Sequence, residues 1–323
     1  MRILFITSTR IGDAVLSSGA ISYLMDQFPN ARLTIVCGAP AAPIFESIPE
    51  LDRLIIVRKK PFHLHWVSIW LACFCTRWDQ VYDLRGSLLC KFLFADRRIV
   101  GKYRDNSVHR VDELAKLLNV FPAPEPRLWL SDRVEAQAEK LMPENIPVLA
   151  IGPTANWGAK QWPANRFAEL AKRVIEPTGL LPGAHVAVLG AENERQMAAE
   201  LLEEIPVDRR IDLIGKPLQV AAACIRRSAL YVGNDSGLMH IAAASQTPTL
   251  GLFGPSSEVR YGPRGKSVAA VRTLESFEDL VLSPDFNHLS ADTLMSGLSV
   301  DSVYQALAKL YTSVKNGSER SVS

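Results

Sequence analysis

Several features that mark well-known classes of protein are missing from these 323 residues. The longest apolar stretch, residues 64–75, is far shorter than the roughly 20 residues that a membrane-spanning helix needs. The N-terminus runs directly into a strand-like segment and carries no signal-peptide cleavage pattern. The five cysteines are an odd number, and none forms a CxxC pair or a zinc-type cluster with histidine. We therefore predict a cytoplasmic protein whose cysteines are reduced and packed in the core.

The glycine patterns of the common nucleotide-binding loops are also missing. The first expected strand-to-helix turn, from Thr7 to Asp13, has Gly12 as its only glycine, whereas a dinucleotide-binding turn needs three spaced glycines. A Walker-type lysine is absent as well, which argues against nicotinamide cofactors and P-loop hydrolysis. No pair of carboxylates stands out as a metal bridge. We expect neither a cofactor nor a tightly bound metal.

The charge of the chain is low and unevenly spread. The net charge is only +2 at pH 7, which argues against a nucleic-acid partner. Residues 1–125 carry 16 Lys and Arg against 12 Asp and Glu, a net charge of +4, whereas residues 126–323 carry 20 against 22, a net charge of −2. The excess is largest in one basic stretch, whose members are Arg85, Lys91, Arg97, Arg98, Lys102, Arg104 and Arg110. This stretch indicates an anionic partner, and an ordinary solvated surface is the alternative.

The apolar stretch 64–75 has two interpretations. Its aromatic residues Trp66, Trp70 and Phe74, preceded by the basic residues 58–60, are typical of an interfacial helix on an anionic bilayer. A core helix explains the same pattern. The first interpretation predicts a protein that is peripherally attached to the inner membrane.

Short β-branched runs alternate with amphipathic segments of helical length. The expected strands are residues 3–7, 33–37, 54–57, 81–84, 148–151, 185–189, 230–232 and 249–253. The expected helices are residues 14–28, 110–118, 164–176, 194–204, 218–227 and 236–244, with a closing helix over 300–314 and a disordered tail over 316–323. This alternation predicts an α/β fold of parallel sheets covered on both faces. Because the pattern restarts near residue 148, we predict two doubly wound, Rossmann-like domains, 1–145 and 146–323, that face an inter-domain cleft.

In the first domain, Asp13 is the residue that could carry chemistry. It lies at the start of the first expected helix, beyond the end of a strand. An aspartate at this position could remove a proton from a substrate hydroxyl as a general base. Capping of the helix is the alternative.

In the second domain, charged residues follow the first two expected strands. Lys160 stands just before a helix that Pro163 begins, so it could reach a diphosphate held at that helix end. Glu192 and Glu194 follow a glycine turn at Gly190, where a carboxylate can accept the hydroxyls of a ribose. The alternatives are a solvated lysine and acidic residues that complement a helix dipole.

The segment from Gly233 to His240 is the strongest signal in the chain. A strand ends in Gly-Asn-Asp-Ser-Gly and passes directly into a helix of small residues. Ser236 and Gly237 then offer backbone N–H groups at a helix N-terminus, which is a ready anion site. His240 lies one turn further along the same face, and a core histidine is the alternative.

Five motifs occur together in one order. They are Arg10-Ile-Gly12-Asp13, Lys160-x-Trp162-Pro163, Gly190-x-x-x-Glu194, Asp235-Ser236-Gly237-x-x-His240 and Phe253-Gly254-Pro255. With these motifs at these spacings, the chain resembles the heptosyltransferases of lipopolysaccharide synthesis, glycosyltransferase family nine, from residue 1 to residue 312. The resemblance implies a GT-B fold, an inverting mechanism and a nucleotide-diphosphate sugar donor, most often ADP-heptose.

The resemblance also implies roles for single residues. It makes Asp13 the catalytic base and Lys160 a ligand of the donor diphosphate. Glu194 becomes the ribose ligand because it lies four residues after the motif glycine, and Glu192 is the second choice. The remaining donor ligands are Asp235, Ser236, Gly237 and His240.

The partner of the first domain is then an acidic glycolipid of the lipopolysaccharide-core type. Arg10, in the first motif, and Arg97 and Arg98, in the basic stretch, are the expected acceptor-binding residues. Two other functions stay open: a GT-B nucleotide-sugar epimerase, which needs no external acceptor, and a non-catalytic nucleotide-sugar or lipid-binding protein.

Overall fold

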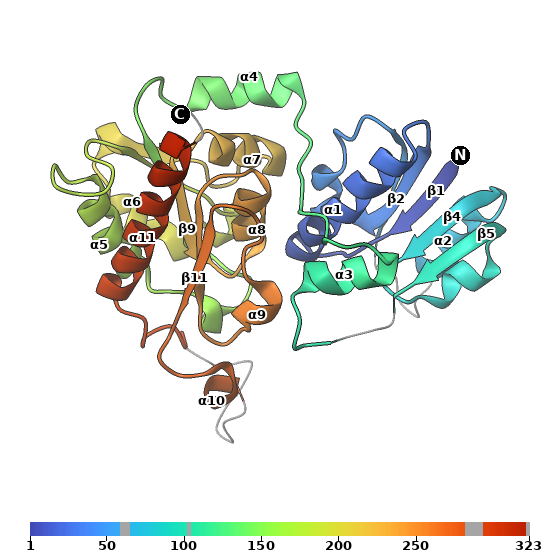
Figure 1. Cartoon of the computed structure of the whole chain (residues 1–323). Coiled ribbons are helices and arrows are strands. Elements are labelled where there is room, and N and C mark those ends of the chain that lie inside the picture. Colours follow the sequence, from blue (N-terminus) through green and yellow to red (C-terminus); the bar gives the residue numbers. More distant parts are fainter. Residues whose placement is uncertain (59–64, 102–104, 282–292, 321–323) are drawn as a thin grey trace. The chain divides into compact units, whose positions relative to one another are not determined.

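The computed structural model describes residues 1–58, 65–101, 105–281 and 293–320. These residues form two compact units, Met1–Ser131 (unit 1) and Asp132–Ser323 (unit 2) (Figure 1). Each unit contains one parallel sheet with helices on both faces. This confirms the predicted α/β fold class.

The sheet of unit 1 has five parallel strands in the order β3-β2-β1-β4-β5. They are β1 (Arg2–Ile6), β2 (Arg32–Gly38), β3 (Leu51–Val57), β4 (Trp78–Asp83) and β5 (Ala95–Val100). Residues 3–6 of the central strand are fully buried, as expected for a parallel strand covered on both faces. The register places Ile6, the last residue of β1, beside Val36 of β2 and Asp83 of β4.

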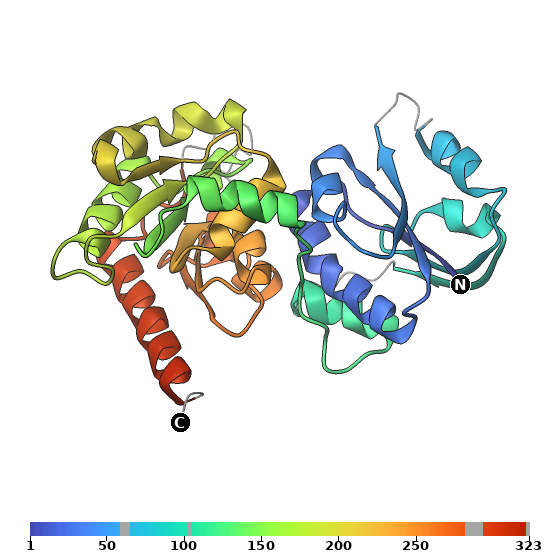
Figure 2. The ribbon, with the colours of Figure 1, turned by 90° about the horizontal axis from the view of Figure 1, so that it is seen from above.

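Helices cover both faces of this sheet (Figure 2). α1 (Ile11–Gln27) and α3 (Arg110–Leu118) contact each other on one face, and α2 (His65–Cys73) lies on the other. The described residues of the unit also form two 3-10 helices, η1 (Ala39–Ile44) and η3 (Leu88–Phe92). Ile69 and Cys73 of α2 belong to one buried cluster with Leu4, Val36 and Val81 of the sheet.

The sheet of unit 2 has six parallel strands in the order β11-β10-β9-β6-β7-β8. They are β6 (Val148–Gly152), β7 (His185–Val188), β8 (Arg210–Asp212), β9 (Leu230–Asn234), β10 (Thr249–Phe253) and β11 (Val268–Arg272). Every residue of β6, β9 and β10 is buried, because these strands lie inside the sheet and under helices.

The helices of unit 2 also form two layers (Figure 1). α5 (Ala164–Ile175), α6 (Ala199–Glu204) and α11 (Val300–Arg320) lie on one face, and α7 (Leu218–Arg226) and α8 (Gly237–Ala244) lie on the other. The remaining helices are α4 (Asp132–Leu141), η4 (Gly158–Lys160), η5 (Glu192–Ala198), η6 (Val207–Arg209), α9 (Glu258–Tyr261) and α10 (Phe277–Val281).

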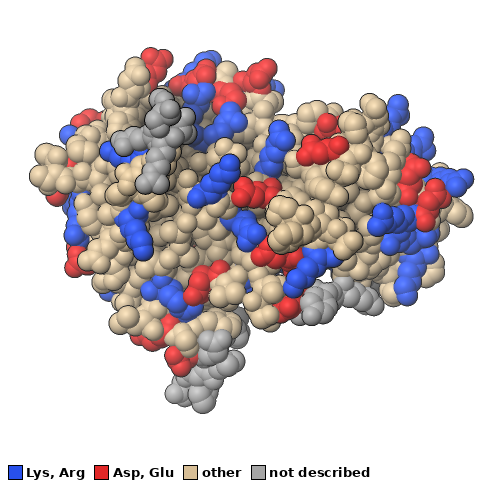
Figure 3. Space-filling view, viewed as in Figure 1, with Lys and Arg blue, Asp and Glu red and all other residues tan. Residues whose placement is uncertain are grey.

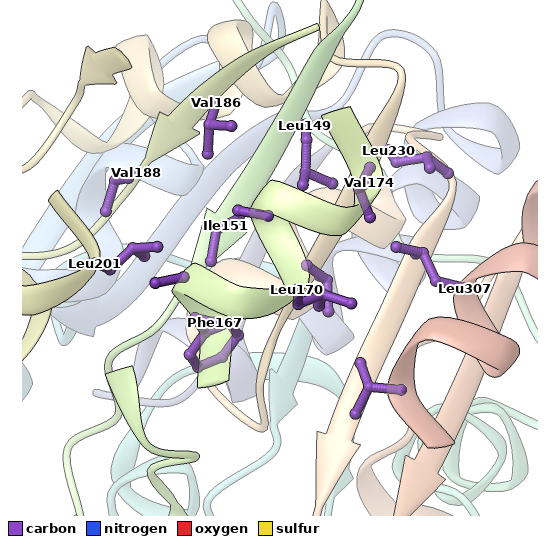
Figure 4. Packing of buried hydrophobic residues seen from close by; sticks show 14 of the residues in the cluster. Leu149, Ile151, Phe167, Leu170, Val174, Val186, Val188, Leu201, Leu230 and Leu307 are labelled. Atoms are coloured by element: carbon purple, nitrogen blue, oxygen red, sulfur yellow. The ribbon is translucent and has the colours of Figure 1, made fainter. Parts of the chain in front are cut away.

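The core of unit 2 is built between α5 and the sheet. Phe167, Leu170 and Val174 recur every three or four residues, so they share one face of α5. Figure 4 shows these side chains pointing toward Leu149 and Ile151 of β6. All five are fully buried, and each contributes about 2 kcal/mol of hydrophobic stabilisation. This packing fixes where β6 ends, and hence where the segment that follows it begins.

The sequence predicted a domain boundary at residue 145, whereas the two units of the structure divide earlier, after Ser131. α4 belongs to unit 2 because it packs on α7. Arg226 of α7 pairs with Glu135 of α4, and Arg227 Nη2 lies 2.6 Å from Glu139 Oε1. These contacts link residues about ninety positions apart, and a composition shift alone does not reveal them.

The structure adds elements that the sequence did not predict. β5, β8 and β11 are edge strands with charged residues, and the hydrophobic pattern missed them. The closing helix continues to Arg320, so the prediction of a disordered tail from residue 316 is wrong for residues 316–320.

The cysteines follow the prediction with one exception. Cys37, Cys73, Cys90 and Cys224 are buried and free, whereas Cys75 is free and exposed. No helix within the described ranges is long and apolar enough to cross a membrane.

Candidate active site residues in the two units

Each sheet reverses its strand order at one point. In unit 1 the chain adds β2 and β3 on one side of β1 and then β4 and β5 on the other, so the reversal lies between β1 and β4. In unit 2 the reversal lies between β6 and β9. Open α/β sheets bind ligands beyond the carboxyl ends of their strands at such points. The predicted residues follow these strands: Asp13 follows β1, Lys160 follows β6 and Asp235 follows β9.

Asp13 lies half-buried in the first turn of α1. Its Oδ2 accepts a hydrogen bond from Ser8 Oγ at 3.3 Å, and Ser8 Oγ in turn accepts one from the backbone N–H of Arg10 at 3.1 Å. Arg10 is the N-cap residue and no side chain caps the helix, so the capping alternative for Asp13 is wrong. The carboxylate therefore stands at the positive end of the helix dipole, held by one hydroxyl. The Arg10 side chain is exposed.

The loop before Asp13 is fixed by close packing on β2. A Cβ atom at Gly38, the last residue of β2, would lie 2.6 Å from the Cα and Cβ atoms of Thr9. The backbone N–H of Gly38 also donates to the carbonyl oxygen of Ser8 at 3.3 Å. A larger residue at position 38 would push the loop away, so this glycine helps to position Asp13.

Asp83, which is not part of any of the sequence motifs, is a buried aspartate at the same end of the unit 1 strands. It ends β4 beside Ile6 and is fully buried. Its carboxylate accepts hydrogen bonds from the backbone N–H groups of Arg85 and Ser87, both at 2.9 Å, and from the Ser87 hydroxyl. An aspartate that ends a strand just before a glycine turn is a signal for such a contact. Asp83 shapes the turn that faces the Asp13 loop.

In unit 2, Lys160 and Asp235 form an ion pair across the strand-order reversal. Lys160 Nζ lies 2.5 Å from Asp235 Oδ2, and the two side chains are 22% and 7% exposed. Lys160 ends η4 after β6, and Asp235 follows β9 directly. The sequence predicted both residues as donor ligands, and the structure brings them together although 75 positions separate them.

Asn234 positions the segment that carries Lys160. Its Oδ1 accepts from the backbone N–H of Trp162 at 3.0 Å, and its Nδ2 donates to the Pro153 carbonyl at 2.7 Å. Both ends of the loop after β6 are thereby tied to the last residue of β9. The indole Nε1 of Trp162 donates to the Leu298 carbonyl at 2.8 Å, which anchors the loop on its other side. The sequence motif contains Asn234 but does not reveal this role.

Glu194 and Glu192 have different environments after β7. Glu194 Oε2 accepts from Thr154 Oγ1 at 2.7 Å and from the backbone N–H of Ala191 at 3.0 Å. Thr154 follows β6, so this contact brings Glu194 to the same edge as Lys160. The other oxygen, Oε1, has no hydrogen-bond partner among the residues that the structure describes.

Glu192 uses both carboxylate oxygens in a bidentate pair with Arg195, at 2.8 and 3.0 Å. This pair lowers the pKa of Glu192 below its ordinary value. Arg195 Nη1 also contacts Asp212 Oδ2 at 2.6 Å. Glu194 is therefore the better placed of the two for a ligand, in agreement with the preference that the sequence motif gave.

The start of α8 lies over a buried phenol. The Tyr231 ring is fully buried, and a Cβ atom at Gly152 or Gly233 would lie 2.1 or 2.6 Å from its hydroxyl. Burial raises the pKa of this phenol, and the Ser236 hydroxyl opposes that rise, so the group stays protonated at neutral pH. Ser236 is the N-cap of α8, and its side chain does not cap the helix. As in every α-helix, the first backbone N–H groups of α8 have no partner within the helix, and Ser236 does not cap them.

Gly237 begins α8, and His240 lies on it one turn later, with 4% of its surface exposed. The donor residues predicted from the sequence thus follow three strands of one sheet, β6, β7 and β9, at their carboxyl ends. The described residues contain no group of three or more His, Cys, Asp and Glu that could hold a metal ion.

The basic stretch of unit 1 does not form one continuous patch. Arg110 pairs with Glu113 within α3. Arg98 donates to three carbonyl oxygens, those of Cys90, Ala95 and Leu93, at 2.9, 2.8 and 2.5 Å. Its guanidinium therefore ties η3 to β5.

The remaining members of the stretch differ. The Arg85 guanidinium lies over the Trp66 ring, 5.1 Å from its centre. Lys91 and Arg97 are exposed. Lys102 and Arg104 lie outside the described residues. Of the predicted acceptor-binding residues in this stretch, Arg97 is the one whose charge faces solvent without a structural hydrogen bond among the described residues.

Comparison with known proteins decides the family. The model of glycosyltransferase family 9 (heptosyltransferase) matches residues 67–282, more than half of the chain. The chain belongs to this family. The lipopolysaccharide heptosyltransferase 2 of Salmonella typhimurium is 26% identical to it over 317 residues, which cover 86% of this chain and 89% of that protein.

Solved structures of family members agree with the assignment. A family 9 glycosyl transferase from Veillonella parvula has a TM-score of 0.77 and 20% identity, covering 97% of each chain. The E. coli heptosyltransferase WaaC with ADP has a TM-score of 0.72 and 17% identity, covering 96% of this chain and 100% of that one. This family 9 chain is therefore a glycosyltransferase of the GT-B fold, as the motifs of the two units predicted.

Proposed function

We propose that this family 9 glycosyltransferase moves a heptose from ADP-heptose to an acidic acceptor of the lipopolysaccharide-core type, with inversion at the anomeric carbon. Relatives named lipopolysaccharide heptosyltransferase cover most of the chain, and a relative with similar fold binds ADP. The observation that carries the proposal is that Lys160, Glu194 and Asp235 come together beyond the carboxyl ends of the unit 2 strands. These residues come from three separate strand ends.

Unit 2 binds the donor in this proposal. The Lys160 ammonium group and the N–H groups at Ser236 and Gly237 contact the diphosphate, because a cation and a helix N-terminus both favour an anion. Glu194 accepts hydrogen bonds from the ribose hydroxyls through Oε1, while Thr154 and Ala191 hold its Oε2. His240 and Asp235 complete the clamp.

The chemical step is a displacement at the anomeric carbon. The acceptor oxygen forms a bond to this carbon as the bond to the diphosphate oxygen breaks, and the electron pair of that bond leaves with the nucleotide. Negative charge grows on the departing diphosphate, so Lys160 and the α8 N–H groups stabilise the transition state more than the bound donor. The new bond forms on the face opposite the leaving group, which inverts the configuration.

Asp13 receives the proton of the acceptor hydroxyl. A carboxylate is the right group because it accepts the proton as the oxygen begins to attack. The Ser8 hydroxyl fixes the orientation of Asp13 by its bond to Oδ2, which leaves Oδ1 for the substrate. Arg10 and Arg97 bind phosphates or acidic sugars of the acceptor, whereas Arg98, the third residue predicted for this role, donates to backbone carbonyls around η3. Because the acceptor is a glycolipid, we also propose that the enzyme works at a membrane surface.

A transfer assay tests the proposal. The protein is incubated with ADP-heptose and a truncated core glycolipid, and mass spectrometry measures the product. We expect one heptose to be added to the glycolipid and ADP to be released in equal amount. Conversion of the nucleotide sugar without any glycolipid would support an epimerase. Binding of donor and acceptor without turnover would support a non-catalytic protein.

A further inference from the structure

α2 carries no charged side chain, and its side that faces away from the sheet is apolar except for Ser68. Its nine residues, HWVSIWLAC, contain no Asp, Glu, Lys or Arg. Ile69 and Cys73 are buried against the sheet, while the side chains on the opposite face, Val67 and Leu71, are 51% and 56% exposed. A helix that is hydrophobic all round is normally covered on all sides. The outer face of α2 therefore exposes apolar side chains that such a helix normally covers.

The segment around η3 extends this apolar surface. Leu88, Phe92 and Phe94 are 63%, 69% and 69% exposed. The indole of Trp70 in α2 donates through Nε1 to the Phe92 carbonyl at 3.0 Å, so the two segments are held side by side. We call the five exposed residues Val67, Leu71, Leu88, Phe92 and Phe94 the apolar face of unit 1.

A groove of about 550 Å³ lies within this region. Its lining includes Trp66, Trp70, Leu89 and Phe92, with Arg85 and Ser87 among the polar members. A large exposed apolar area in an otherwise polar surface marks a site of interaction with a protein, a ligand or a membrane. The chemistry around the area decides among these.

The charges beside the apolar face are mainly positive. Arg85 stacks on Trp66, and Lys91 is exposed on η3. The nearest exposed acid in the sequence, Asp96, is paired with Arg77 at 3.1 Å. Figure 3 shows Lys and Arg side chains at the end of unit 1, with Asp and Glu side chains between some of them.

We propose that the apolar face docks unit 1 onto a bilayer of anionic phospholipid. Phenylalanine and leucine side chains enter the acyl region, and the tryptophans lie at the interface, where their rings have one apolar and one polar side. Lys91 contacts the lipid phosphates. A second copy of the chain is a poorer occupant, because a symmetric contact would bring these like charges together.

The surface extends to the carboxyl end of β4, which lies beside the end of β1, the strand that precedes Asp13. Ser87 lines the groove and donates to Asp83, which ends β4 beside Ile6. A lipid-anchored acceptor would therefore reach the catalytic base from the bilayer on which the enzyme lies. The proposal deepens the proposed function but does not need sugar transfer, because vesicles without any acceptor test it.

Co-sedimentation with sucrose-loaded vesicles provides the test. The full-length protein is mixed with vesicles of phosphatidylcholine plus phosphatidylglycerol, and with vesicles of phosphatidylcholine alone. We expect binding to the anionic vesicles that weakens with added salt, because the lipid charges are screened. Absence of binding to anionic vesicles overturns the proposal, as does equal binding to both compositions.

Variants locate the contact. The double variant Phe92→Ser/Phe94→Ser should bind anionic vesicles at least about tenfold more weakly, because two aromatic rings no longer leave water. The control Val207→Ser/Leu274→Ser also removes two exposed apolar side chains, which are 77% and 96% exposed in unit 2, and should bind like the wild type. A second variant, Lys91→Glu, leaves the apolar residues intact and should weaken binding as well. Wild-type binding by both test variants would show that the apolar face is not the docking surface.

Two further outcomes separate this idea from its rivals. In sedimentation velocity, the wild type should not form a dimer that the substitutions Phe92→Ser/Phe94→Ser dissociate. A dimer of this kind would show that the apolar face binds a second copy of the chain. With a delipidated, soluble acceptor, the double variant should keep the turnover of the wild type. If it loses turnover on that soluble acceptor while still binding vesicles, the face belongs to the acceptor site and the docking proposal is wrong.

Discussion

Lys160 Nζ lies 2.5 Å from Asp235 Oδ2, and this ion pair joins the segments that follow two adjacent central strands. The aspartate is 7% exposed, so the lysine neutralises a charge that water hardly reaches. Lys160 is 22% exposed and can present its remaining N–H groups to a ligand. The same lysine thus stabilises the fold and provides positive charge where the proposed donor binds in unit 2.

Replacement of Lys160 should therefore affect two measurements. In Lys160→Ala, the KM for the donor should rise and turnover should fall, because charge that develops on the diphosphate loses a partner. The free energy of unfolding should also fall by roughly 2–3 kcal/mol, since Asp235 stays buried without its cation. Steady-state kinetics and denaturant titration measure these effects. Unchanged donor kinetics would contradict the diphosphate assignment.

Lys172 provides a matched control. Its pair with Glu204 has both side chains half exposed, at 51% and 50%. Exposed pairs contribute about 0–1 kcal/mol, so Lys172→Ala should change neither kinetics nor stability appreciably. The double variant Lys160→Ala/Asp235→Ala should recover part of the stability that Lys160→Ala loses, because no unpaired charge remains.

Glu194 should control how the enzyme distinguishes a ribose from a deoxyribose. The wild type should bind ADP about tenfold more tightly than 2′-deoxy-ADP, the effect of one hydrogen bond to a charged group. Glu194→Gln should lose most of this difference, and isothermal titration calorimetry measures it. Glu192→Gln should keep the difference, since Arg195 already occupies both oxygens of that carboxylate. Loss of discrimination in Glu192→Gln alone would reverse the assignment.

The sequence predicted the buried strands well, for a physical reason. β1, β6, β9 and β10 are buried on both faces, so each has a continuous apolar run. β5 is an edge strand with the residues ADRRIV, and its exposed polar positions hide it from a search for apolar runs. The pattern detects burial, and edge strands are the least buried part of a sheet.

The motif residues were recognised because their chemistry is local to each turn. The contacts that hold these residues in place could not be recognised in the same way. Asn234 holds Trp162 across 72 positions, and Asp83 was passed over although its turn borders the Asp13 loop. Arg98 was assigned to the acceptor by its charge, whereas its hydrogen bonds go to backbone carbonyls. A sequence shows that a residue is charged, and only the fold shows which partner already uses the charge.

Substitution of Arg98 should change stability, whereas substitution of Arg97 should change acceptor binding. Arg98→Ala should lower the free energy of unfolding by about 1–2 kcal/mol, because three carbonyl oxygens around η3 lose a charged donor. Arg97→Ala should leave stability unchanged and raise the KM for an acidic acceptor, with donor affinity preserved. Thermal unfolding and acceptor titration measure the two effects. A rise in donor Kd for Arg97→Ala would contradict the assignment of the acceptor to unit 1.

The cysteines should differ sharply in reactivity. Burial raises the pKa of Cys37 to about 12 and those of Cys73 and Cys224 to about 11, and it also raises that of Cys90. At pH 8 a thiol with a pKa of 11 is ionised in roughly one molecule in a thousand, and the thiolate is the reactive form. Alkylation of the folded protein at pH 8 should therefore modify Cys75 alone. Peptide mapping measures this, and rapid labelling of Cys73 would show that α2 is not packed on the sheet.

The most direct test of the account concerns Asp13 and its proposed role as the base. In Asp13→Asn, the isosteric amide cannot take the proton, so turnover on ADP-heptose and the core acceptor should fall by at least about 10²-fold. The Kd for ADP should stay within about twofold of the wild-type value, because the donor ligands all belong to unit 2, and RT ln 2 is well below 1 kcal/mol. Asp26→Asn, an exposed aspartate near the other end of the same helix, should behave like the wild type in both measurements. Near-normal turnover in Asp13→Asn would contradict the account.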